Sequence, residues 1–395
     1  MALRGAGAAL ALAVVLALGV CAAQPAQAQT FTVLYNFGGT PDAGNPYAGL
    51  VRDEAGNLYG TTAFGGAFRG GGGAVFKVHG HNESVLYSFC FLSGCPDGSL
   101  PYSSLVRDAA GNLYGTTFRG GTGCSQDDCG TVFKVDSSGT ETVLYSFTGG
   151  TTDGCNPWGG LVRDGAGNLY GTTSGCGASG WGTVFKVDTS DAETVLHNFS
   201  TSEGGIPEYT ALLMDKGGNL YGFTGNGSGV LYKLSSSGTF TVLHTFGLRR
   251  RDGTSPYGTP AMDKDGNLYG TTRDGGSHTN GIVWKVSQKG KETVLHRFRD
   301  SDGVAPIGGV VLDGKGNLYG TTQWANGVFS GTVYKLNKKG VLTVLHFFNG
   351  TDGAVPYGNL ILDKAGNLYG TASEGGSSGT GCGGVGCGTV WKVTP

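Results

Sequence analysis

The side chains best suited to acid–base catalysis lie in the variable segments of this 395-residue chain. They are three carboxylates and one imidazole, Asp127, Asp274, His278 and Glu374. A lyase or hydrolase acting on a polysaccharide needs an acid and a base within hydrogen-bond reach of the bond that breaks. These residues come from separate parts of the sequence, and no spacing among them predicts convergence. We therefore predict no catalytic residue, and we keep a polysaccharide lyase or hydrolase as the alternative function.

Four histidines occupy one position of a repeated string, where other copies of the string carry tyrosine. The histidines are His197, His244, His296 and His346, and the tyrosines are Tyr35, Tyr87 and Tyr145. Imidazole is a frequent zinc ligand. Because each histidine belongs to a different copy of an outermost strand, the four should lie too far apart to share a metal ion. We expect them to pack as tyrosine does, and we predict no metal site.

Eight cysteines follow the N-terminal segment, an even number that suits disulfide pairing in an oxidising compartment. Three pairs share a separation of five residues, and the fourth spans two connecting segments of one repeat. The expected disulfides are Cys90–Cys95, Cys124–Cys129, Cys155–Cys176 and Cys382–Cys387. Zinc is the alternative for Cys124 and Cys129, but their spacing differs from that of zinc ligand pairs.

Two glycine-rich strings match catalytic or cofactor motifs by their letters alone. Residues 375–379 fit the nucleophile-elbow pattern, and residues 379–384 fit a dinucleotide fingerprint. Both motifs require a strand followed by a helix, whereas a second strand follows here. In a chain with 77 glycines such matches arise by chance, and we expect no cofactor.

The elements that must position these residues are the strands of a tandem repeat. The string Gly-Asn-Leu-Tyr-Gly begins at seven places, namely Gly56, Gly111, Gly167, Gly218, Gly266, Gly316 and Gly366. Three further short strings accompany each copy, rich in β-branched and aromatic residues and bounded by turn residues, which are strand signals. Four short strands repeated seven times predict an all-β, seven-bladed β-propeller with four strands per blade.

The phase of the repeat predicts how the ring closes. The mature chain opens with a fourth-strand string at residues 31–37 and ends with a third-strand string at residues 388–393. The strand missing at one end is therefore the spare strand at the other. We expect the N-terminal strand to complete the last blade, because this pairing removes two exposed sheet edges.

The strings Gly-Asn-Leu-Tyr-Gly-Thr-Thr and Gly-Thr-Val-Phe-Lys-Val together resemble the GloVer (Gloeo/Verruco) tandem repeat of the choice-of-anchor proteins. The resemblance covers essentially all of residues 31–395. It implies an exported bacterial repeat protein without an assigned activity, so no functional residue is carried over. Relatives often have a C-terminal anchor segment, which we do not expect here because the sequence stops at Pro395, two residues after its last predicted strand.

Residues 1–28 are expected to be a Sec-type signal peptide. Arg4 supplies a positive charge, an apolar stretch follows at residues 8–20, and Ala26 to Ala28 fit the cleavage rule. Lipidation of Cys21 is the alternative. No later stretch approaches the ~20 apolar residues of a membrane span. We expect residues 29–395 to form a single propeller domain that is secreted, whether extracellular, at the cell surface or in the periplasm.

The formal net charge of −2 gives no general attraction to nucleic acid or to an anionic membrane. We expect a monomer whose ligand binds where the repeat varies, at the two positions after each repeated second strand. The candidate binding residues are Phe64, Phe118, Arg119, Asn226, Arg273, Asp274, Trp324 and Glu374. Aromatic, amide and acidic groups suit polar, ring-bearing ligands, and unselected loop variation is the alternative.

Aromatic residues also begin six of the seven predicted first strands, near the expected mouth of a central channel. They are Tyr47, Tyr102, Trp158, Tyr209, Tyr257 and Tyr357, and the seventh position is Ile307. They could form a stacking platform, but packing between blades is the favoured role. The leading hypothesis is a non-enzymatic scaffold that binds an extracellular polysaccharide or a protein on its cysteine-rich face.

Overall fold

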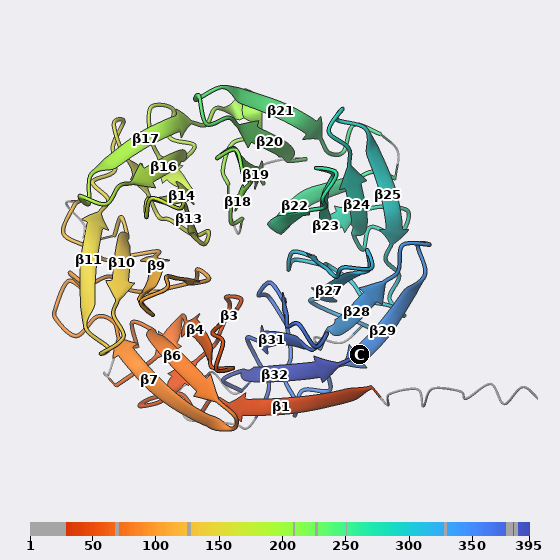
Figure 1. Cartoon of the computed structure of the whole chain (residues 1–395), viewed down its shortest axis with the longest axis horizontal. Coiled ribbons are helices and arrows are strands. Elements are labelled where there is room, and N and C mark those ends of the chain that lie inside the picture. The colour runs from red at the N-terminus through yellow and green to blue at the C-terminus, as the bar shows by residue number, and fades with distance from the viewer. Residues whose placement is uncertain are drawn as a thin grey trace, which may run out of the picture.

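The strands of the protein form seven four-stranded antiparallel sheets, arranged as blades around a central axis (Figure 1). The computed structural model describes residues 29–67, 71–124, 128–207, 210–225, 228–249, 251–327, 330–376, 382 and 386–395. The predicted all-β, seven-bladed propeller is confirmed. Within the described ranges no helix is long and apolar enough to cross a membrane. The expected signal peptide and Cys21 lie outside these ranges.

Each blade runs from an inner strand beside the axis to an outer strand at the rim. Blade 1 has β3 (Val51–Arg52), β4 (Leu58–Thr62), β6 (Ala74–His79) and β7 (Asn82–Ser88). Blade 2 has β8 (Val106–Arg107), β9 (Leu113–Thr117), β10 (Thr131–Val135) and β11 (Glu141–Ser146). Blade 3 has β13 (Val162–Arg163), β14 (Leu169–Thr173), β16 (Thr183–Val187) and β17 (Glu193–Asn198). Blade 4 has β18 (Leu213–Met214), β19 (Leu220–Thr224), β20 (Val230–Leu234) and β21 (Phe240–Thr245).

The remaining blades follow the same order. Blade 5 has β22 (Gly253–Met262), β23 (Leu268–Gly275), β24 (Ile282–Val286) and β25 (Glu292–Arg297). Blade 6 has β26 (Val311–Leu312), β27 (Leu318–Thr322), β28 (Thr332–Leu336) and β29 (Leu342–Phe347). Blade 7 has β30 (Ile361–Leu362), β31 (Leu368–Ala372), β32 (Thr389–Thr394) and β1 (Thr30–Asn36). Smaller elements are the pair β2 (Ala43–Gly44) and β5 (Phe64–Gly65), the pair β12 (Gly154–Cys155) and β15 (Gly175–Cys176), and the 3-10 turn η1 (Thr201–Glu203).

The ring closes through the predicted pairing of its two ends. Strand β1 runs antiparallel to β32, from Thr30 opposite Thr394 to Asn36 opposite Thr389. Blade 7 therefore takes its outer strand from the first described residues and its inner three strands from the last ones (Figure 1). Because β1 and β32 pair with each other, the sheet edges that each would expose alone are covered.

A repeated aromatic contact holds neighbouring blades together. The phenylalanine after each outer strand packs on the aromatic ring of the third strand in the next blade, with ring centroids 4.9 to 5.6 Å apart. The pairs are Phe37–Phe76, Phe89–Phe133, Phe147–Phe185, Phe199–Tyr232, Phe246–Trp284, Phe298–Tyr334 and Phe348–Trp391. Each such pair adds roughly 0.5–1.5 kcal/mol beyond the area it buries, so the seven contacts stabilise the packing of every blade against the next.

The same aromatic ring explains the second glycine of the Gly-Asn-Leu-Tyr-Gly string. A Cβ atom on Gly60 would lie 2.6 Å from the Phe76 ring, and one on Gly270 would lie 2.4 Å from the Trp284 ring. Because those rings are fully buried, they cannot move aside. Glycine in the second strand is thus required by the aromatic residue in the third.

The Asp-x-x-Gly-Asn turn joins the first two strands of each blade and is built by the aspartate. In blade 1, Asn57 donates to Asp53 from its backbone N–H (2.8 Å) and its side-chain amide (2.6 Å), and the Tyr59 hydroxyl also donates to Asp53 (3.0 Å). Gly56 takes a φ of 89°, which glycine adopts without strain. Burial raises the pKa of Asp53, but these hydrogen bonds outweigh it and hold the pKa below its ordinary value.

Each junction between blades also contains three neighbouring side chains that we call the junction triad. The first is a tyrosine or histidine near the end of one outer strand, the second is an acid in the connection that follows, and the third is a residue at the start of the next outer strand. The ring–acid pairs are Tyr35–Asp42, Tyr87–Asp97, Tyr145–Asp153, His197–Glu203, His244–Asp252, His296–Asp302 and His346–Asp352. The third residues, in the same order, are Glu83, Glu141, Glu193, Phe240, Glu292, Leu342 and Phe31.

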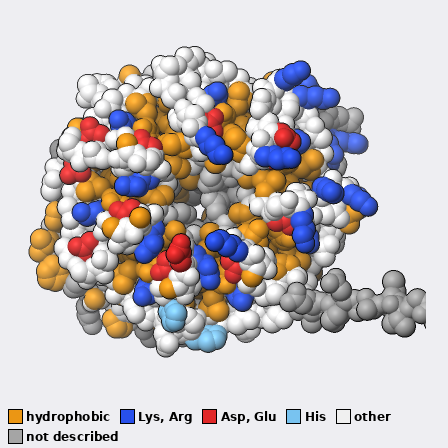
Figure 2. Space-filling view, viewed as in Figure 1, with side chains coloured by type: hydrophobic (Ala, Val, Ile, Leu, Met, Phe, Trp, Pro, Cys, Tyr) orange, Lys and Arg blue, Asp and Glu red, His pale blue; other side chains and the backbone are white. Residues whose placement is uncertain are grey.

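The antiparallel order of the blades separates two kinds of connection on opposite faces. Short hairpins join first to second and third to fourth strands on one face, and the longer connections that carry the cysteines lie on the other. In the view of Figure 2, Lys and Arg side chains are spread around the ring with Asp and Glu between them, and the axis is hollowed. The charges on this visible face are therefore mixed rather than gathered into one basic patch.

Candidate functional site

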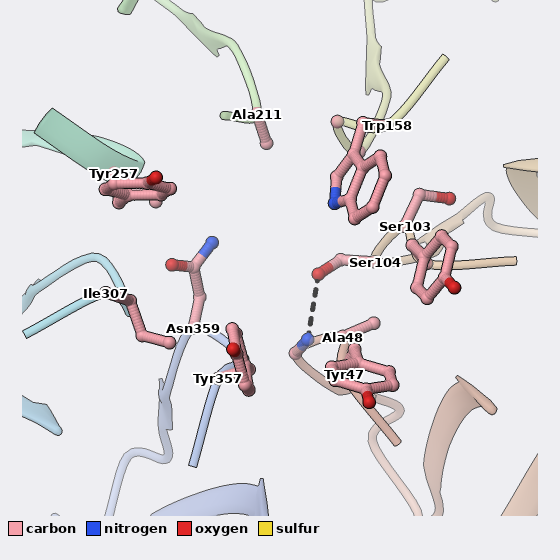
Figure 3. A pocket seen from close by; sticks show the side chains of 16 residues that line it. Tyr47, Ala48, Ser103, Ser104, Trp158, Ala211, Tyr257, Ile307, Tyr357 and Asn359 are labelled. Atoms are coloured by element: carbon pink, nitrogen blue, oxygen red, sulfur yellow. Dashed lines mark hydrogen bonds between the residues drawn. The ribbon is translucent and has the colours of Figure 1, made fainter. Parts of the chain in front are cut away.

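A cavity of about 250 Å³ lies on the axis where the blades meet (Figure 3). Its wall is formed by the segments that lead into the inner strands, and all seven blades contribute to it. The lining includes five of the aromatic residues expected at the channel mouth, together with Ile307: Tyr47, Tyr102, Trp158, Tyr257 and Tyr357. Tyr209 lies outside the described residues. These aromatic side chains, whose favoured role from the sequence was packing between blades, thus surround a cavity.

A left-handed turn before a buried proline introduces each lining segment. In six blades the residue before this proline has a φ of 55° to 57°: Asn45, Leu100, Asn156, Ser255, Ala305 and Val355. Such a φ is uncommon outside glycine and costly for a β-branched residue such as Val355. The N–H group of each of these residues donates to a carbonyl of the preceding blade, as Asn45 does to Cys387 (2.7 Å). The turn is therefore held from the neighbouring blade, which fixes where the next residue enters the channel.

The rings on one side of the cavity form a continuous aromatic wall. Tyr102 and Trp158 are stacked with centroids 4.5 Å apart and planes 2° from parallel. Phe118 meets Trp158 edge to face at 4.5 Å, and Tyr47 contacts Tyr102 at 5.5 Å and Tyr357 at 5.2 Å. The wall therefore runs from blade 7 through blades 1 and 2 to blade 3, and Figure 3 shows Tyr357, Tyr47 and Trp158 around the cavity.

Small and amide side chains line the cavity beyond the aromatic wall. Asn359 points toward the axis (Figure 3), where its amide donates to the Thr259 hydroxyl at 2.6 Å and its carbonyl oxygen accepts from the Gly309 N–H at 2.6 Å. The Gly49 N–H donates to the Ser104 hydroxyl at 3.0 Å. The Gly309 and Ser104 contacts join adjacent blades, whereas the Thr259 contact joins blade 7 to blade 5, and all three place polar groups in or beside the cavity wall.

Polar and charged side chains from the variable positions surround the aromatic mouth. The Gln323 amide donates to the Tyr357 hydroxyl at 2.7 Å. Burial raises the pKa of Tyr357, and Arg273 and Glu374 act on it in opposite directions. Burial, with Tyr102, Tyr357 and Glu374 nearby, raises the pKa of Tyr47 to about 12. At neutral pH these phenols are neutral groups that can both donate and accept hydrogen bonds.

The two variable positions of a blade make different contacts. In blades 2 and 6 the first contacts a ring of the cavity lining, since Phe118 packs on Trp158 and Gln323 donates to Tyr357. The second pairs by its backbone with the connection that enters the same blade. These pairings are Phe64 with Gly44, Arg119 with Ser99, Asp274 with Thr254, Trp324 with Val304 and Glu374 with Ala354. Asn226 lies outside the described residues.

This two-residue strand extension differs from the freely variable loop that the sequence suggested. Phe64 is 41% exposed on β5, and Arg119 forms a surface ion pair with Asp128 at 3.2 Å. Arg273 and Glu374 are close enough to the aromatic wall to influence the pKa of Tyr357. The sequence could have separated the two positions, because the second strand continues past the repeated string and consecutive residues of a strand point to opposite faces.

The acid–base candidates do not form a group among the described residues. His278 is exposed, and no carboxylate of the described chain lies within 4.0 Å of its ring nitrogens. Burial raises the pKa of Glu374, but the described residues that line the cavity include no aspartate, glutamate or histidine. Asp274 lies in β23, paired with Thr254, and Asp127 lies outside the described residues.

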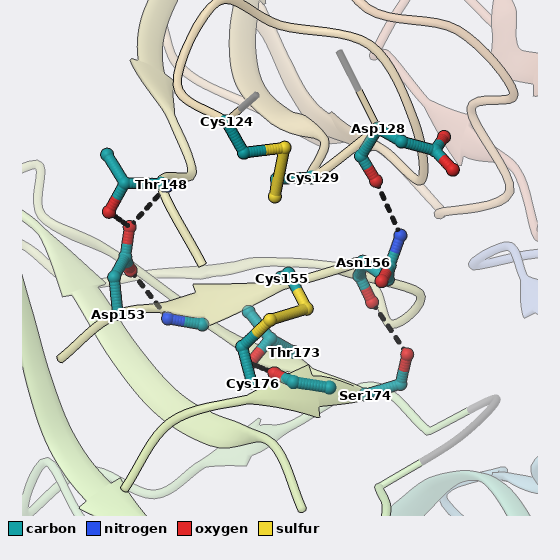
Figure 4. Close-up of a disulfide and its surroundings, with 12 residues drawn as sticks. Cys124, Asp128, Cys129, Thr148, Asp153, Cys155, Asn156, Thr173, Ser174 and Cys176 are labelled. Atoms are coloured by element: carbon teal, nitrogen blue, oxygen red, sulfur yellow. Dashed lines mark hydrogen bonds between the residues drawn. A yellow bond between two sulfur atoms is a disulfide. The ribbon is translucent and has the colours of Figure 1, made fainter. Parts of the chain in front are cut away.

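Four disulfides lie in the longer connections of the face that carries the variable positions. They join Cys90 to Cys95, Cys124 to Cys129, Cys155 to Cys176 and Cys382 to Cys387, which are the four pairs expected from the sequence. Figure 4 shows two of them beside Asn156, whose side-chain amide donates to the carbonyls of Phe118 (3.1 Å) and Asp128 (2.9 Å). The disulfide-bonded connections thus support the loop that carries Phe118 into the aromatic wall.

A comparison with curated proteins finds no significant match. Among solved structures, a gluconolactonase from Xanthomonas campestris is 15% identical, with a TM-score of 0.43 over 72% of this chain and 82% of that one. A structural-genomics target described as a candidate gluconolactonase is 12% identical, with a TM-score of 0.40 over 67% of this chain and 80% of that one.

The family comparison covers almost the whole chain. The Gloeobacter/Verrucomicrobia repeat matches residues 19–154, 122–258 and 225–395. These three overlapping segments contain every blade of the ring, in agreement with the resemblance of the repeated strings. The chain therefore belongs to the Gloeobacter/Verrucomicrobia repeat family.

Proposed function

We propose that this protein is an exported, monomeric scaffold that binds an extracellular glycan by one end, in the aromatic mouth of its axial cavity. The observation that carries the proposal is the aromatic wall of Tyr47, Tyr102, Trp158 and Phe118 beside a cavity on the axis. Aromatic rings offer flat apolar faces, and the carbon-bound hydrogens of a sugar ring suit such faces.

The polar groups around the wall match the hydroxyl groups of a sugar. Tyr357, Gln323 and Asn359 can donate and accept hydrogen bonds, and Arg273 and Glu374 add charges of both signs at the mouth. A volume of about 250 Å³ is slightly below the roughly 300–1,000 Å³ of typical small-molecule pockets. The cavity therefore suits a terminal sugar or a short end segment rather than the middle of a polymer.

A non-enzymatic role is favoured over a lyase or hydrolase by the chemistry of the lining. Glycosidic cleavage by the usual route uses two carboxyl groups on either side of the bond. The described lining offers phenols, an indole, small hydroxyls and an amide. These groups can hold a sugar, but they lack an acid and a base placed to transfer protons.

Export is supported by the chemistry of the cysteines and by the first residues of the sequence. Four disulfides suit an oxidising compartment, and residues 1–28 have the pattern of a signal peptide. A protein found outside the cytoplasm meets glycans of cell surfaces and of surrounding polymers, which is the environment that the proposed ligand requires.

The test is retention of glycans by mature residues 29–395, with mass spectrometry of the bound and released material. Trp158→Ala removes the ring that stacks on Tyr102 and contacts Phe118, and Phe347→Ala is the matched control because Phe347 is a 44% exposed aromatic on outer strand β29. We expect intact glycan to be retained by the native protein and the control, and at least about tenfold weaker binding by Trp158→Ala, the loss of roughly one stacked ring.

The other outcomes contradict the proposal in different ways. Shortened glycans in the released material would establish a lyase or hydrolase. Equal retention by Trp158→Ala and the native protein would place binding away from the axis. If no glycan in a panel of bacterial and plant polysaccharides were retained, a protein partner would become the better hypothesis. A thermal melt of each variant separates loss of binding from loss of folding.

A further inference from the structure

The acid of the junction triad is satisfied in the same way at six of the seven junctions. The N–H group that follows the packed phenylalanine donates to it at 2.6 to 2.9 Å. In the best-satisfied case, Asp153 also accepts from Tyr145 at 2.9 Å and from the Thr148 hydroxyl at 2.8 Å. A buried carboxylate with several donors needs no further partner.

The junction between blades 4 and 5 is the exception. Asp252 is 6% exposed, and its Oδ1 atom accepts from the Gly253 N–H at 2.8 Å. No hydrogen-bond donor among the described residues reaches its Oδ2 atom, and Gly247, at the place of the usual backbone donor, makes no such bond in the described chain. A buried carboxylate oxygen without a donor is costly, so this atom calls for a partner.

Two further groups point at the same place. His244 Nε2 lies 4.0 Å from Asp252 Oδ2 and 3.9 Å from Glu292 Oε2. Both His244 Nε2 and Glu292 Oε1 are buried and have no hydrogen-bond partner among the described residues. Only 12%, 1% and 6% of the His244, Asp252 and Glu292 side chains are exposed. Three potential ligand atoms thus lie within 4.8 Å of one another.

The spacing of these atoms suits a small cation. Two of the three distances are about 4 Å and the third is at most 4.8 Å, so the point equidistant from the three atoms lies no more than about 2.5 Å from each, near the roughly 2.0–2.2 Å of zinc bonds to nitrogen and oxygen. One imidazole with two carboxylates favours zinc and its neighbours in the first transition series over magnesium and calcium, which prefer oxygen alone. We infer that His244, Asp252 and Glu292 bind a divalent transition-metal ion, best represented by Zn²⁺, at the junction of blades 4 and 5.

The other junctions of the chain show why only this one has the necessary ligands. Tyr145, Asp153 and Glu193 supply two acids but a phenol in place of the imidazole. His296 and Asp302 approach to 3.0 Å, and the third position there is Leu342. The site combines a histidine with two acids, and each of these features occurs separately elsewhere in the ring.

A proton shared between the two carboxylates could occupy the site in place of a metal ion, and nearby arginines affect its affinity. Arg249 and Arg297 are exposed, and they lower the pKa of Glu292, which burial and Asp252 raise to about 7. A proton shared by Asp252 and Glu292 is therefore the rival way to satisfy the pair. His244 and Glu292 lie on outer strands β21 and β25, and Asp252 lies in the connection before β22. None of the three lines the axial cavity, so the site is separate from the proposed glycan binding.

The test uses mature residues 29–395, freed of metal with a chelator and then titrated with Zn²⁺ by calorimetry. His244→Tyr recreates the Tyr–Asp–Glu triad found at three native junctions, and Glu292→Leu recreates the His–Asp–Leu triad of blades 5 and 6. Both variants therefore introduce arrangements that the scaffold already accommodates. His296→Tyr is the matched control, because it changes a histidine at the same repeat position without a second acid.

We expect one tight equivalent of Zn²⁺ in the native protein and in His296→Tyr, with a higher melting temperature when the metal is bound. Affinity should fall at least about tenfold in His244→Tyr and in Glu292→Leu, because each loses one ligand. Cobalt(II) should give visible absorption of a nitrogen- and oxygen-ligated ion in the native protein and in His296→Tyr, but not in His244→Tyr or Glu292→Leu. Absence of a tight equivalent, or unchanged affinity in both ligand variants, would overturn the proposal in favour of the shared proton.

Discussion

The three junctions nearest the N-terminus and the four that follow place different side chains on the same backbone. At the first three, Tyr35, Tyr87 and Tyr145 donate to an aspartate, and a glutamate occupies the third position. At the last four a histidine replaces the tyrosine, and the third position is apolar except at Glu292. The repeat therefore places two chemically different rings beside the acid of the junction.

At every junction except that of His244, the type of residue at the third position follows the type of ring beside it. Where the ring is tyrosine, burial and the neighbouring aspartate raise the pKa of Glu83, Glu141 and Glu193 to about 7, so a glutamate there can be neutral. Where the ring is histidine, an aromatic residue can cover the imidazole, as Phe31 stacks on His346 at 3.5 Å and Phe240 on His197 at 4.1 Å. The one histidine with a second acid is the proposed metal site.

Removing the acid should affect the tyrosine junctions most. Asp153 is 4% exposed and accepts from Tyr145, from both groups of Thr148 and from the Gly154 N–H. Asp153→Ala leaves these donors unpaired and should lower the free energy of unfolding by roughly 4 kcal/mol. Asp352→Ala should cost roughly 2 kcal/mol, because that side chain is 16% exposed and has fewer donors. Urea unfolding measures both values, and equal losses would contradict the comparison.

Disulfides add a second difference between the two parts of the ring. Three of the four lie in the connections of blades 1 to 3, and the described parts of blades 4 to 6 contain none. Replacing Cys155 and Cys176 together by serine should cost about 3 kcal/mol by the chain-entropy estimate, and replacing Cys90 and Cys95 about 2 kcal/mol. Hydrogen exchange should rise in blades 2 and 3 after the first change and stay unaltered in blade 5. A uniform rise over the ring would show that the disulfide stabilises the whole fold rather than its own connections.

The glutamates of the tyrosine junctions should make stability depend on pH. Their folded pKa of about 7 lies above an unfolded value of roughly 4.3. The unfolded chain therefore loses these protons first, and stability should fall as pH rises from about 4.3 to 7. The triple variant Glu83→Gln, Glu141→Gln, Glu193→Gln should lose most of this fall in urea midpoint between pH 5 and pH 8. An unchanged pH profile would mean that these carboxylates are not desolvated in solution.

The smallest effect should come from a single hydroxyl. Tyr145→Phe removes one donor to Asp153 and leaves the bonds from Thr148 and Gly154 in place. We expect a loss of about 1 kcal/mol, measurable as a shift in urea midpoint without a change in slope. Tyr114→Phe is the control outside the triads, since its hydroxyl donates to the turn carboxylate of Asp108. A loss at Tyr145 as large as that of Asp153→Ala would mean that the phenol alone holds the acid.

The sequence determined the ring because the relevant signals are local and repeated. Strand length, turn chemistry and hydrophobic alternation act over a few residues, and seven copies with a displaced phase leave closure through β1 as the consistent solution. The shared separation of five residues in three cysteine pairs is also a local signal. The phenylalanine of the fourth-strand string and the aromatic of the third-strand string were also visible in every repeat, and their contact between blades could have been predicted.

Tertiary structure alone decided what the sites contain. Phe118 meets Trp158 across two blades because a strand extension pairs Arg119 with Ser99, and neither contact follows from spacing. His244 meets Glu292 because neighbouring blades pack at a fixed angle and bring together residues 48 positions apart. Sequence periodicity describes each blade separately, whereas a site between blades depends on how the blades pack and on the residues that differ from one repeat to the next.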